Sequence, residues 1–330
     1  MGGVGEAGAF SKRALMTVSL RFVDASEWDC SADSLYSRLV AEATGQPVAI
    51  VSDARAHVDL ELVSVHAPEF KRLARTALSV SLGRNYRRRL RRAERWNSIY
   101  REPSPLARRS VWFTGDNIRP PGGAWDGYLS FDLDPLSGRN AYFPHWWEYT
   151  GILGSRRISY SGLDLDVDLL MREREPDTDR PAFACAFIGN PTPVRLHAIE
   201  ALSKVGPVDV YGNSVGRPVP SKAAVAKNYR YVLCFENDLY PGYTTEKPFE
   251  AWATGAIPLW WGSDPAGYVN PRAVINAADF ESLGAFAGAV HQLETDESTR
   301  AAVAASPILQ RAPDLGPALA LVRSLLVENR

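Results

Sequence analysis

Residues 231–262, YVLCFENDLYPGYTTEKPFEAWATGAIPLWWG, are the part of the chain that decides the fold. The segment begins and ends with apolar runs typical of buried strands, and the pattern from about Thr245 to Thr254 predicts a helix between them. Polar groups stand where these elements meet, namely Glu236, Asn237, Glu246 and Lys247. Ligands of open parallel sheets bind beyond the carboxyl ends of the strands, so this junction is a candidate ligand site.

The rest of the chain also alternates short apolar runs with helical patterns. Strands are expected at 17–23, 47–53, 58–65, 109–115, 125–132, 182–190, 207–213 and 273–280. Helices are expected at 31–44, 193–203, 221–227, 282–292, 296–304 and 315–327. This alternation predicts an α/β protein with two Rossmann-like, doubly wound domains facing an interdomain cleft.

The length of 330 residues exceeds one typical domain. We expect residues 1–16 to be a disordered leader and residues 17–170 to form the N-terminal domain, with a basic insertion near 68–101. Residues 171–182 are charged and flanked by proline, which is typical of a linker. Residues 183–330 would then form the C-terminal domain.

The charge, the cysteines and the lengths of the apolar runs lead us to expect a cytoplasmic protein. The formal net charge of -1 provides no global attraction to nucleic acid or membranes. The cysteines Cys30, Cys185 and Cys234 have no CxxC spacing, which argues against a disulfide framework or structural zinc. No apolar run approaches the ~20 residues that span a bilayer. Cys234 and the aromatic run 142–149 are expected to be buried.

Local charge is uneven, because the segment Arg84–Arg95 is strongly basic. This run is most often a solvated helix face, but it also suits peripheral contact with an anionic membrane or a lipid-linked acceptor. A nucleic-acid patch is a third alternative. We expect no nucleic-acid partner, and we keep membrane contact as a weaker prediction.

The chemistry of the 231–262 segment points to a sugar nucleotide. Glu246 and Lys247 would begin a helix, and Pro248 suits its first turn because no N–H is needed there. A helix start with a lysine favours an anion, whereas a carboxylate beside it favours hydroxyls. Phosphate together with hydroxyls is the composition of a nucleotide sugar.

The motif FEN…YTTEK…AIPLWWG resembles the signature of the α-1,3-fucosyltransferase family (glycosyltransferase family 10), especially its soluble bacterial members. The likeness continues through VINAADF, extends upstream to NPTPVRLHAIEAL, and reaches SVWFTGDN and YLSFD weakly. It implies a GT-B enzyme with an N-terminal acceptor domain and a C-terminal GDP-sugar donor domain. The implied reaction is inverting, α-1,3-type transfer of L-fucose from GDP-fucose to a glycan or lipid-linked glycan, in cell-surface glycan biosynthesis.

The resemblance also implies residue roles. Glu246 would hold the fucose hydroxyls, and Lys247 and Arg195 would bind the diphosphate. Asn237 and Tyr243 would line the donor site, although both also suit purely structural roles. The family's base is a glutamate in a TGEN turn, and TGDN here makes Asp116 the candidate. Asp116 is one methylene shorter than that glutamate. Either its loop comes closer to the acceptor, or the role of base is weakened here or lies elsewhere; the spare carboxylates nearby are Asp126, Asp132 and Glu148.

No metal or other cofactor is predicted to be required. The DLDVD sequence (Asp164, Asp166, Asp168) is similar to a metal-binding DxD motif. Its aspartates alternate with Leu and Val, however, and this alternation is more typical of an edge strand with one solvent-exposed face. Two alternatives to fucosyl transfer stay open at this point. The same fold could use another nucleotide sugar, or the protein could bind sugar nucleotides or polyanions without catalysis.

Overall fold

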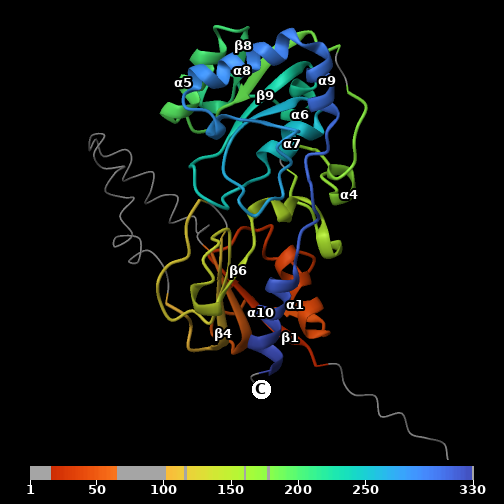
Figure 1. Ribbon diagram of the computed structural model, residues 1–330. Helices are drawn as coiled ribbons and strands as arrows, with labels where there is room; N and C mark the ends of the chain where they lie inside the picture. Colours follow the sequence, from red (N-terminus) through yellow and green to blue (C-terminus); the bar gives the residue numbers. More distant parts are fainter. Residues whose placement is uncertain (1–15, 65–101, 115–116, 160, 177–178, 329–330) are drawn as a thin grey trace, which may run out of the picture.

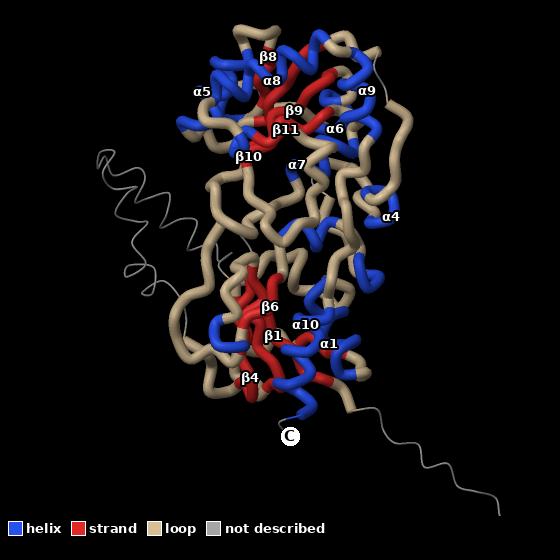
Figure 2. Tube along the Cα trace, viewed as in Figure 1, coloured by secondary structure: helices blue, strands red, loops and turns tan. Residues whose placement is uncertain are grey.

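The computed structural model describes residues 16–64, 102–114, 117–159, 161–176 and 179–328, which form two α/β domains, each built on a parallel sheet (Figure 1). The two sheets are stacked end to end along the molecule (Figure 2). Most of the expected leader, the basic insertion at 68–101 with Arg84–Arg95, and Asp116 lie outside the described residues.

The N-terminal sheet has six parallel strands in the order β2-β1-β3-β4-β5-β6. They are β1 (Val18–Val23), β2 (Val48–Ile50), β3 (Val58–Val63), β4 (Ala107–Phe113), β5 (Gly127–Ser130) and β6 (Asn140–Tyr142). Helix α1 (Leu35–Thr44) begins at Ser34, whose side chain caps it, and ends at Gly45 in the left-handed conformation. Apolar residues that alternate along β1, β3 and β4 bury one sheet face against α1.

The C-terminal sheet has five parallel strands in the order β11-β10-β9-β7-β8. They are β7 (Ala182–Phe187), β8 (Val208–Tyr211), β9 (Tyr229–Phe235), β10 (Ile257–Trp261) and β11 (Ile275–Asn276). Helices α5 (Pro193–Leu202) and α8 (Leu283–Thr295) pack on one face, where Tyr231, Leu233 and Phe235 of β9 point. Helices α6 (Lys222–Ala226) and α7 (Lys247–Ala253) lie on the other, and α9 (Glu297–Ala305) follows α8. The predicted pair of doubly wound parallel domains is therefore confirmed.

The structure differs from the expected domain limits at the C-terminus. Helix α10 (Gly316–Arg323) and the π-helix η7 (Ser324–Glu328) lie beside α1 and not on the C-terminal sheet, as the dark blue segment in the lower domain shows (Figure 1). The Arg323 Nε donates to the Ala43 carbonyl at 3.2 Å. The expected helix at 315–327 exists, but it completes the N-terminal domain.

Two further segments differ from simple expectations. The DLDVD aspartates do not lie on an edge strand: Asp166 caps the short helix α4 (Val167–Leu170), and Asp164 and Asp166 both pair with Arg157. In the expected linker, the half-buried Arg174 and the buried Arg180 donate to backbone carbonyls of the C-terminal domain. This charged segment is thereby fixed to the C-terminal domain by its arginines.

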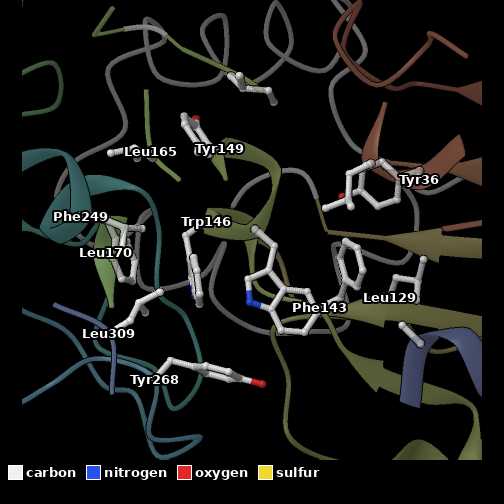
Figure 3. Close-up of a cluster of buried hydrophobic side chains, with 14 of the residues drawn as sticks. Tyr36, Leu129, Phe143, Trp146, Tyr149, Leu165, Leu170, Phe249, Tyr268 and Leu309 are labelled. Carbon is white, nitrogen blue, oxygen red and sulfur yellow. The ribbon is translucent and has the colours of Figure 1, made fainter. Parts of the chain in front are cut away.

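Aromatic side chains join the two domains. Trp146 packs against Phe249 of α7 with ring centroids 4.6 Å apart, and Tyr142 stacks on Tyr268 at 6.2 Å. Figure 3 shows Trp146 from the N-terminal domain beside Phe249 and Tyr268 from the C-terminal domain. Trp146 and Trp147 are fully buried, which confirms the prediction that the 142–149 run packs in the core. The shared aromatic core places the carboxyl end of β9 beside the N-terminal domain.

Candidate active site

A cavity of about 350 Å³ opens at the carboxyl ends of β7 and β9, between α6 and α7. The charged and amide side chains that line it include Arg195, Lys222, Asn237, Glu246, Lys247 and Glu250. Four of the residues predicted from the sequence, Arg195, Asn237, Glu246 and Lys247, are thus brought to one site. They come from α5, from the end of β9 and from the start of α7.

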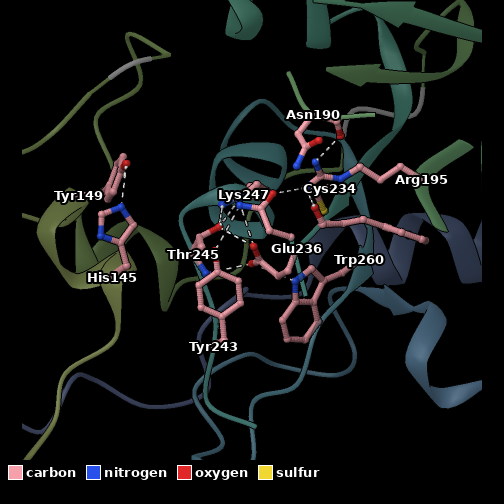
Figure 4. Close-up of polar contacts among 12 residues, drawn as sticks. His145, Tyr149, Asn190, Arg195, Cys234, Glu236, Tyr243, Thr245, Lys247 and Trp260 are labelled. Atoms are coloured by element: carbon pink, nitrogen blue, oxygen red, sulfur yellow. Dashed lines mark hydrogen bonds and ion pairs between the residues drawn. The ribbon is translucent and has the colours of Figure 1, made fainter. Parts of the chain in front are cut away.

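Glu236 holds the site residues Thr245 and Lys247 in place from behind the cavity wall, a role that the sequence analysis did not predict. Its carboxylate is completely buried directly after β9. It accepts hydrogen bonds from the Thr245 N–H at 2.9 Å, the Thr245 hydroxyl at 2.8 Å and the Lys247 Nζ at 3.1 Å (Figure 4). The Trp260 indole N–H donates to it at 3.4 Å. Glu236 therefore fixes the turn that leads into α7.

Lys247 is held as a cation at the cavity wall. Its Nζ also donates to the Thr245 hydroxyl at 2.8 Å. Burial alone would lower the pKa of Lys247, but the charges of Glu236 and Glu246 outweigh it and raise the pKa above its ordinary value. Lys247 thus stays protonated and pre-positioned toward the cavity.

Glu246 presents an ionised carboxylate to the same space. It stands at the N-cap of α7, and its side chain makes no capping hydrogen bond there. Burial alone would raise its pKa, but the charges of Lys247 and of His145 from the N-terminal domain hold it below the ordinary value. The carboxylate is therefore an acceptor for donors that enter the cavity.

Arg195 is buried at the start of α5. Its guanidinium donates to the carbonyls of Asn190 at 2.9 Å and Phe235 at 2.6 Å, and to the Asn237 Oδ1 at 3.0 Å. An arginine has five N–H donors, so two N–H groups are available for an anion in the cavity. Burial lowers the pKa of this guanidinium, and the charge of Glu236 opposes that change.

Asn237 and Tyr243 are placed differently from each other. Asn237 lines the cavity, and its Nδ2 donates to the Tyr243 hydroxyl at 3.5 Å. Tyr243 is not among the lining residues; its ring packs edge-on against Phe131 of the N-terminal domain at 5.0 Å. Tyr243 is therefore part of the domain interface beside the donor cavity.

Glu250 lies one helical turn after Glu246 and also lines the cavity. Burial, and then the charge of Glu246, raise the pKa of Glu250 to about 7; Ser161, through a side-chain hydrogen bond, and Lys222 oppose this increase. The sequence analysis missed this residue. The spacing of four residues from Glu246, which places both on one helix face, was the available signal.

The candidate base cannot be located, because Asp116 lies outside the described residues. The three spare carboxylates have other partners. Asp126 accepts from the Ser110 N–H at 2.8 Å, and Asp132 accepts from the Tyr240 hydroxyl at 2.9 Å. Glu148 is buried and accepts from the Tyr36 hydroxyl and from the His145 Nδ1, each at 3.0 Å.

Two classes of site receive no support from the described part of the chain. There, no group of three or more His, Cys, Asp or Glu side chains is arranged to hold a metal ion. Within the same ranges, no helix combines the length and the apolar character needed to cross a membrane.

Comparison with known proteins confirms the resemblance over the C-terminal domain. Residues 179–301 match the family model described as glycosyltransferase family 10 (fucosyltransferase) C-term. The chain is 33% identical over 200 residues to an alpha-(1,3)-fucosyltransferase of Helicobacter pylori, covering 53% of this chain and 42% of that protein. It is 27% identical over 212 residues to a human 4-galactosyl-N-acetylglucosaminide 3-alpha-L-fucosyltransferase, covering 60% and 54%. The matched segment thus spans about half the length of these relatives.

Solved structures share the architecture of both domains. A crystal structure of an alpha1,3-fucosyltransferase with GDP has a TM-score of 0.64 at 18% identity and covers 97% of this chain and 93% of that one. One with GDP-fucose has a TM-score of 0.61 at 18% identity, covering 98% and 94%. The predicted GT-B fold is thereby confirmed.

Proposed function

We propose that this chain, whose C-terminal domain matches the model of glycosyltransferase family 10, transfers L-fucose from GDP-fucose to a glycan hydroxyl with inversion. The observation that carries the proposal is the cavity in which Lys247 and Arg195 stand beside the carboxylate of Glu246. Fixed cations suit a diphosphate, and a fixed carboxylate suits sugar hydroxyls. Solved structures of this fold contain GDP or GDP-fucose, which supports the donor.

The cations would stabilise the leaving group. As the bond between fucose C1 and the β-phosphate oxygen breaks, negative charge develops on GDP. Lys247 is already held by Glu236 and Thr245, and Arg195 by two backbone carbonyls, so neither needs to reorganise during the reaction. Stabilisation of the transition state by pre-positioned charges is usually the largest single contribution that an enzyme makes to lowering the activation barrier.

The carboxylates would serve the sugar and the acceptor. Glu246, which is ionised, would accept hydrogen bonds from fucose hydroxyls and stabilise positive charge that develops at C1. The acceptor oxygen would attack C1 from the face opposite the diphosphate, while a base takes its proton. We retain Asp116 as that base.

We propose that this transfer needs no metal, because Lys247 and Arg195 supply counter-charge to the diphosphate. The proposal is supported by the pKa of Lys247, which is raised above its ordinary value, so that the cation persists near neutral pH. Transfer that survives a chelator with undiminished rate is expected. A rate that falls with EDTA and returns with Mn²⁺ or Mg²⁺ would contradict it.

The finer setting is also a proposal. We place the reaction in the cytoplasm, on a glycan or lipid-linked glycan destined for the cell surface. All three cysteines are free thiols, and Cys30 is exposed, which fits a reducing compartment. Peripheral membrane contact through Arg84–Arg95 stays a prediction, since those residues lie outside the described part of the chain.

The test measures donor binding and turnover together. Thermal unfolding is recorded with GDP-fucose, GDP, GDP-mannose and UDP-galactose, and GDP-fucose consumption is followed with a panel of galactosyl and N-acetylglucosaminyl acceptors. A ligand at a hundred times its Kd should add about 2.7 kcal/mol to stability. Glu246→Ala should abolish transfer while retaining the fold, whereas the exposed Glu297→Ala should match the wild type. Full turnover by Glu246→Ala, or equal stabilisation by all the nucleotides, would overturn the proposal.

A further inference from the structure

The 3₁₀ helix η3 (His145–Tyr149) brings a histidine of the N-terminal domain to the domain interface beside α7. It follows the carboxyl end of β6, so it lies at the edge of the N-terminal sheet where the strands end. Trp146, the next residue after His145, packs on Phe249 with ring centroids 4.6 Å apart, and Phe249 is the third residue after Glu246. The starts of η3 and α7 therefore lie near each other across the interface.

Both ring nitrogens of His145 have partners on their own side of this interface. Nδ1 lies 3.0 Å from the Glu148 carboxylate, in an ion pair whose side chains are 20% and 5% exposed. Nε2 lies 3.5 Å from the Tyr149 hydroxyl (Figure 4). The ring is thus fixed, and its ion pair is with Glu148 and not with Glu246. His145 therefore acts on Glu246 through its charge and not through direct contact.

Glu148 belongs to a buried cluster that carries one negative charge. The Tyr36 hydroxyl donates to Glu148 at 3.0 Å. Burial, and then the charge of Glu148, raise the pKa of Asp29 to about 8, so a protonated Asp29 shares a hydrogen bond with Glu148 near neutral pH. Asp29 also accepts from the N–H and hydroxyl of Ser26. His145 neutralises the remaining charge, and its imidazolium is the more exposed member of the ion pair.

Glu246 interacts with cations from both domains. Burial alone would raise its pKa, but the charges of Lys247, then His145, and also Lys222 lower it. Lys247 and Lys222 line the donor cavity, whereas His145 is not among the lining residues. A diphosphate in the cavity would therefore be paired with the lysines and would leave the charge of His145 available to Glu246.

We propose that His145 is a positioning residue for the transfer reaction, whose imidazolium compensates the charge of the Glu246 carboxylate while the diphosphate of the donor occupies Lys247. This rests on the proposed function, because it takes Lys247 as a diphosphate ligand and Glu246 as the ligand of the fucose hydroxyls. Without the second cation, Glu246 would face the diphosphate as a neighbour of like charge, which favours protonation of the carboxylate. The N-terminal domain thus sets the charge at the sugar site through His145.

The first test compares a nucleotide that carries fucose with one that does not. Dissociation constants of GDP-fucose and GDP are measured by calorimetry at pH 8 without acceptor. His145→Asn keeps an amide that can donate to Glu148 but has no charge, so the ratio of the Kd of GDP-fucose to that of GDP should rise roughly threefold or more, while the Kd of GDP changes less than about twofold. The exposed His291→Asn on α8 is the matched control and should keep both wild-type values.

Two further measurements separate the effect of charge from a purely structural role. In a double-mutant cycle, His145→Asn should leave the ratio unchanged when Glu246→Gln is already present, since no carboxylate is left to compensate. Burial alone would lower the pKa of His145, but Glu148, followed by Glu246 and Asp29, raises it to about 9. The imidazolium is therefore present below about pH 9 and lost above it, so the wild-type ratio should approach that of His145→Asn between about pH 8 and about pH 10.

The outcomes separate this inference from the proposed function. If His145→Asn keeps the wild-type ratio, the inference is wrong while donor binding stands. If the variant weakens GDP and GDP-fucose by the same factor, or if its effect persists beside Glu246→Gln, His145 only supports the interface and the inference is again wrong. If wild-type protein binds neither GDP nor GDP-fucose, the proposed function fails, and the inference fails with it.

Discussion

At the scale of single residues, Glu236 controls the site without lining the cavity. A completely buried carboxylate is costly unless it is paired and hydrogen-bonded. Glu236 meets that requirement with the ammonium of Lys247, both donors of Thr245 and the Trp260 indole. Its charge also raises the pKa of Lys247. The position and charge of the phosphate-binding lysine are thus set by a residue that the ligand does not need to touch.

Glu236→Gln tests this dependence. Glutamine keeps the shape but turns an NH₂ group toward donors of Thr245 or Lys247, so we expect a loss of about 1–3 kcal/mol in unfolding free energy and weaker pyrophosphate binding. Urea denaturation and calorimetry measure the two effects. Glu297→Gln, on the exposed start of α9, is the matched control. Wild-type stability together with wild-type pyrophosphate affinity would contradict the assignment.

Four site residues could be assigned a role because the motif and the topology agree. Glu236 was placed at the same junction, but its role in holding Lys247 and Thr245 could not be predicted. The alternation in β9 places residues 232 and 234 on the α7 side of the sheet, and Glu236 continues that phase. Sequence alone does not say which helix covers that side or which donors it brings. Arg195 was predicted to bind phosphate, but three of its N–H groups hold the protein's own carbonyl oxygens; sequence alone does not reveal these partners.

At the scale of elements, the loop from Asn237 to Tyr243 couples the donor cavity to the N-terminal domain. The Tyr240 hydroxyl donates to Asp132 at 2.9 Å, and the Arg119 guanidinium lies 3.6 Å from the centre of the Tyr240 ring. The Tyr142 hydroxyl donates to the Gly242 carbonyl at 3.2 Å. The same loop begins at Asn237, which lines the cavity. A displacement of this loop should therefore move Asn237 and change the shape of the donor cavity.

Gly242→Ala is the direct test of that coupling. Gly242 has φ +87°, and a Cβ there would lie 2.3 Å from the Phe131 carbonyl oxygen. Because backbone must move, we expect a loss of about 1–3 kcal/mol in stability and weaker GDP binding. Gly216→Ala is the matched control, since Gly216 has φ +68° with no atom within 4 Å of the added Cβ. Equal effects of the two variants on thermal unfolding and GDP binding would show that backbone strain alone explains them.

Elements with strong local patterns were predictable, and their partners were not. The helix expected at 315–327 forms, but its apolar face packs on the N-terminal domain, which periodicity cannot reveal. The alternating DLDVD sequence suggested a strand. Asp166 instead accepts hydrogen bonds from the N–H groups of Asp168 and Leu169, and this local capping favours a helical turn over extended backbone.

At the scale of the whole molecule, a buried titratable cluster lies near the domain interface. Burial and then the charge of Glu148 raise the pKa of Asp29 to about 8. Burial alone would lower the pKa of His145, but Glu148 raises it to about 9. Both groups hold protons more tightly when folded than when unfolded. Their contribution to the free energy of unfolding is fully present below the pKa values of the unfolded state. It is lost as the pH rises through the pKa values of the folded state.

Stability should therefore fall from about pH 5 to about pH 9, with Asp29 contributing to the fall below about pH 8 and His145 contributing between about pH 6.5 and about pH 9. Each proton retained only by the folded state contributes at most about 1.4 kcal/mol per pH unit. Asn at position 29 does not titrate but can still donate to Glu148. We expect the difference in unfolding free energy between Asp29→Asn and wild type to change steadily from pH 5 to pH 8 in urea titrations. A constant difference would show that Asp29 is ionised in the folded protein.

The course of the chain makes its last residues part of the first domain. After building the C-terminal sheet, the chain returns through α10 and η7 to the N-terminal sheet. There the Arg109 Nε of β4 donates to the Leu325 carbonyl at 3.4 Å, and the Leu325 side chain lies so near Gly127 of β5 that a Cβ added to this glycine would be 3.3 Å from it. Leu325 is buried, whereas Val327 beside it is exposed. A substitution that removes packing in η7 should therefore destabilise the N-terminal domain first, although Leu325 and Gly127 lie almost 200 residues apart in the sequence.

Leu325→Ala tests this arrangement against Val327→Ala. Removing a buried leucine side chain costs about 2–5 kcal/mol, whereas the exposed valine should cost almost nothing. Hydrogen exchange locates the loss: amides of β1, β5 and α1 should exchange faster in Leu325→Ala, while those of β9 and β10 keep their wild-type rates until the whole protein unfolds. GDP binding at the C-terminal cavity should persist under the same conditions. Faster exchange that appears first in β9 and β10 would mean that η7 stabilises the donor domain, and that the returning chain is not an integral part of the N-terminal fold.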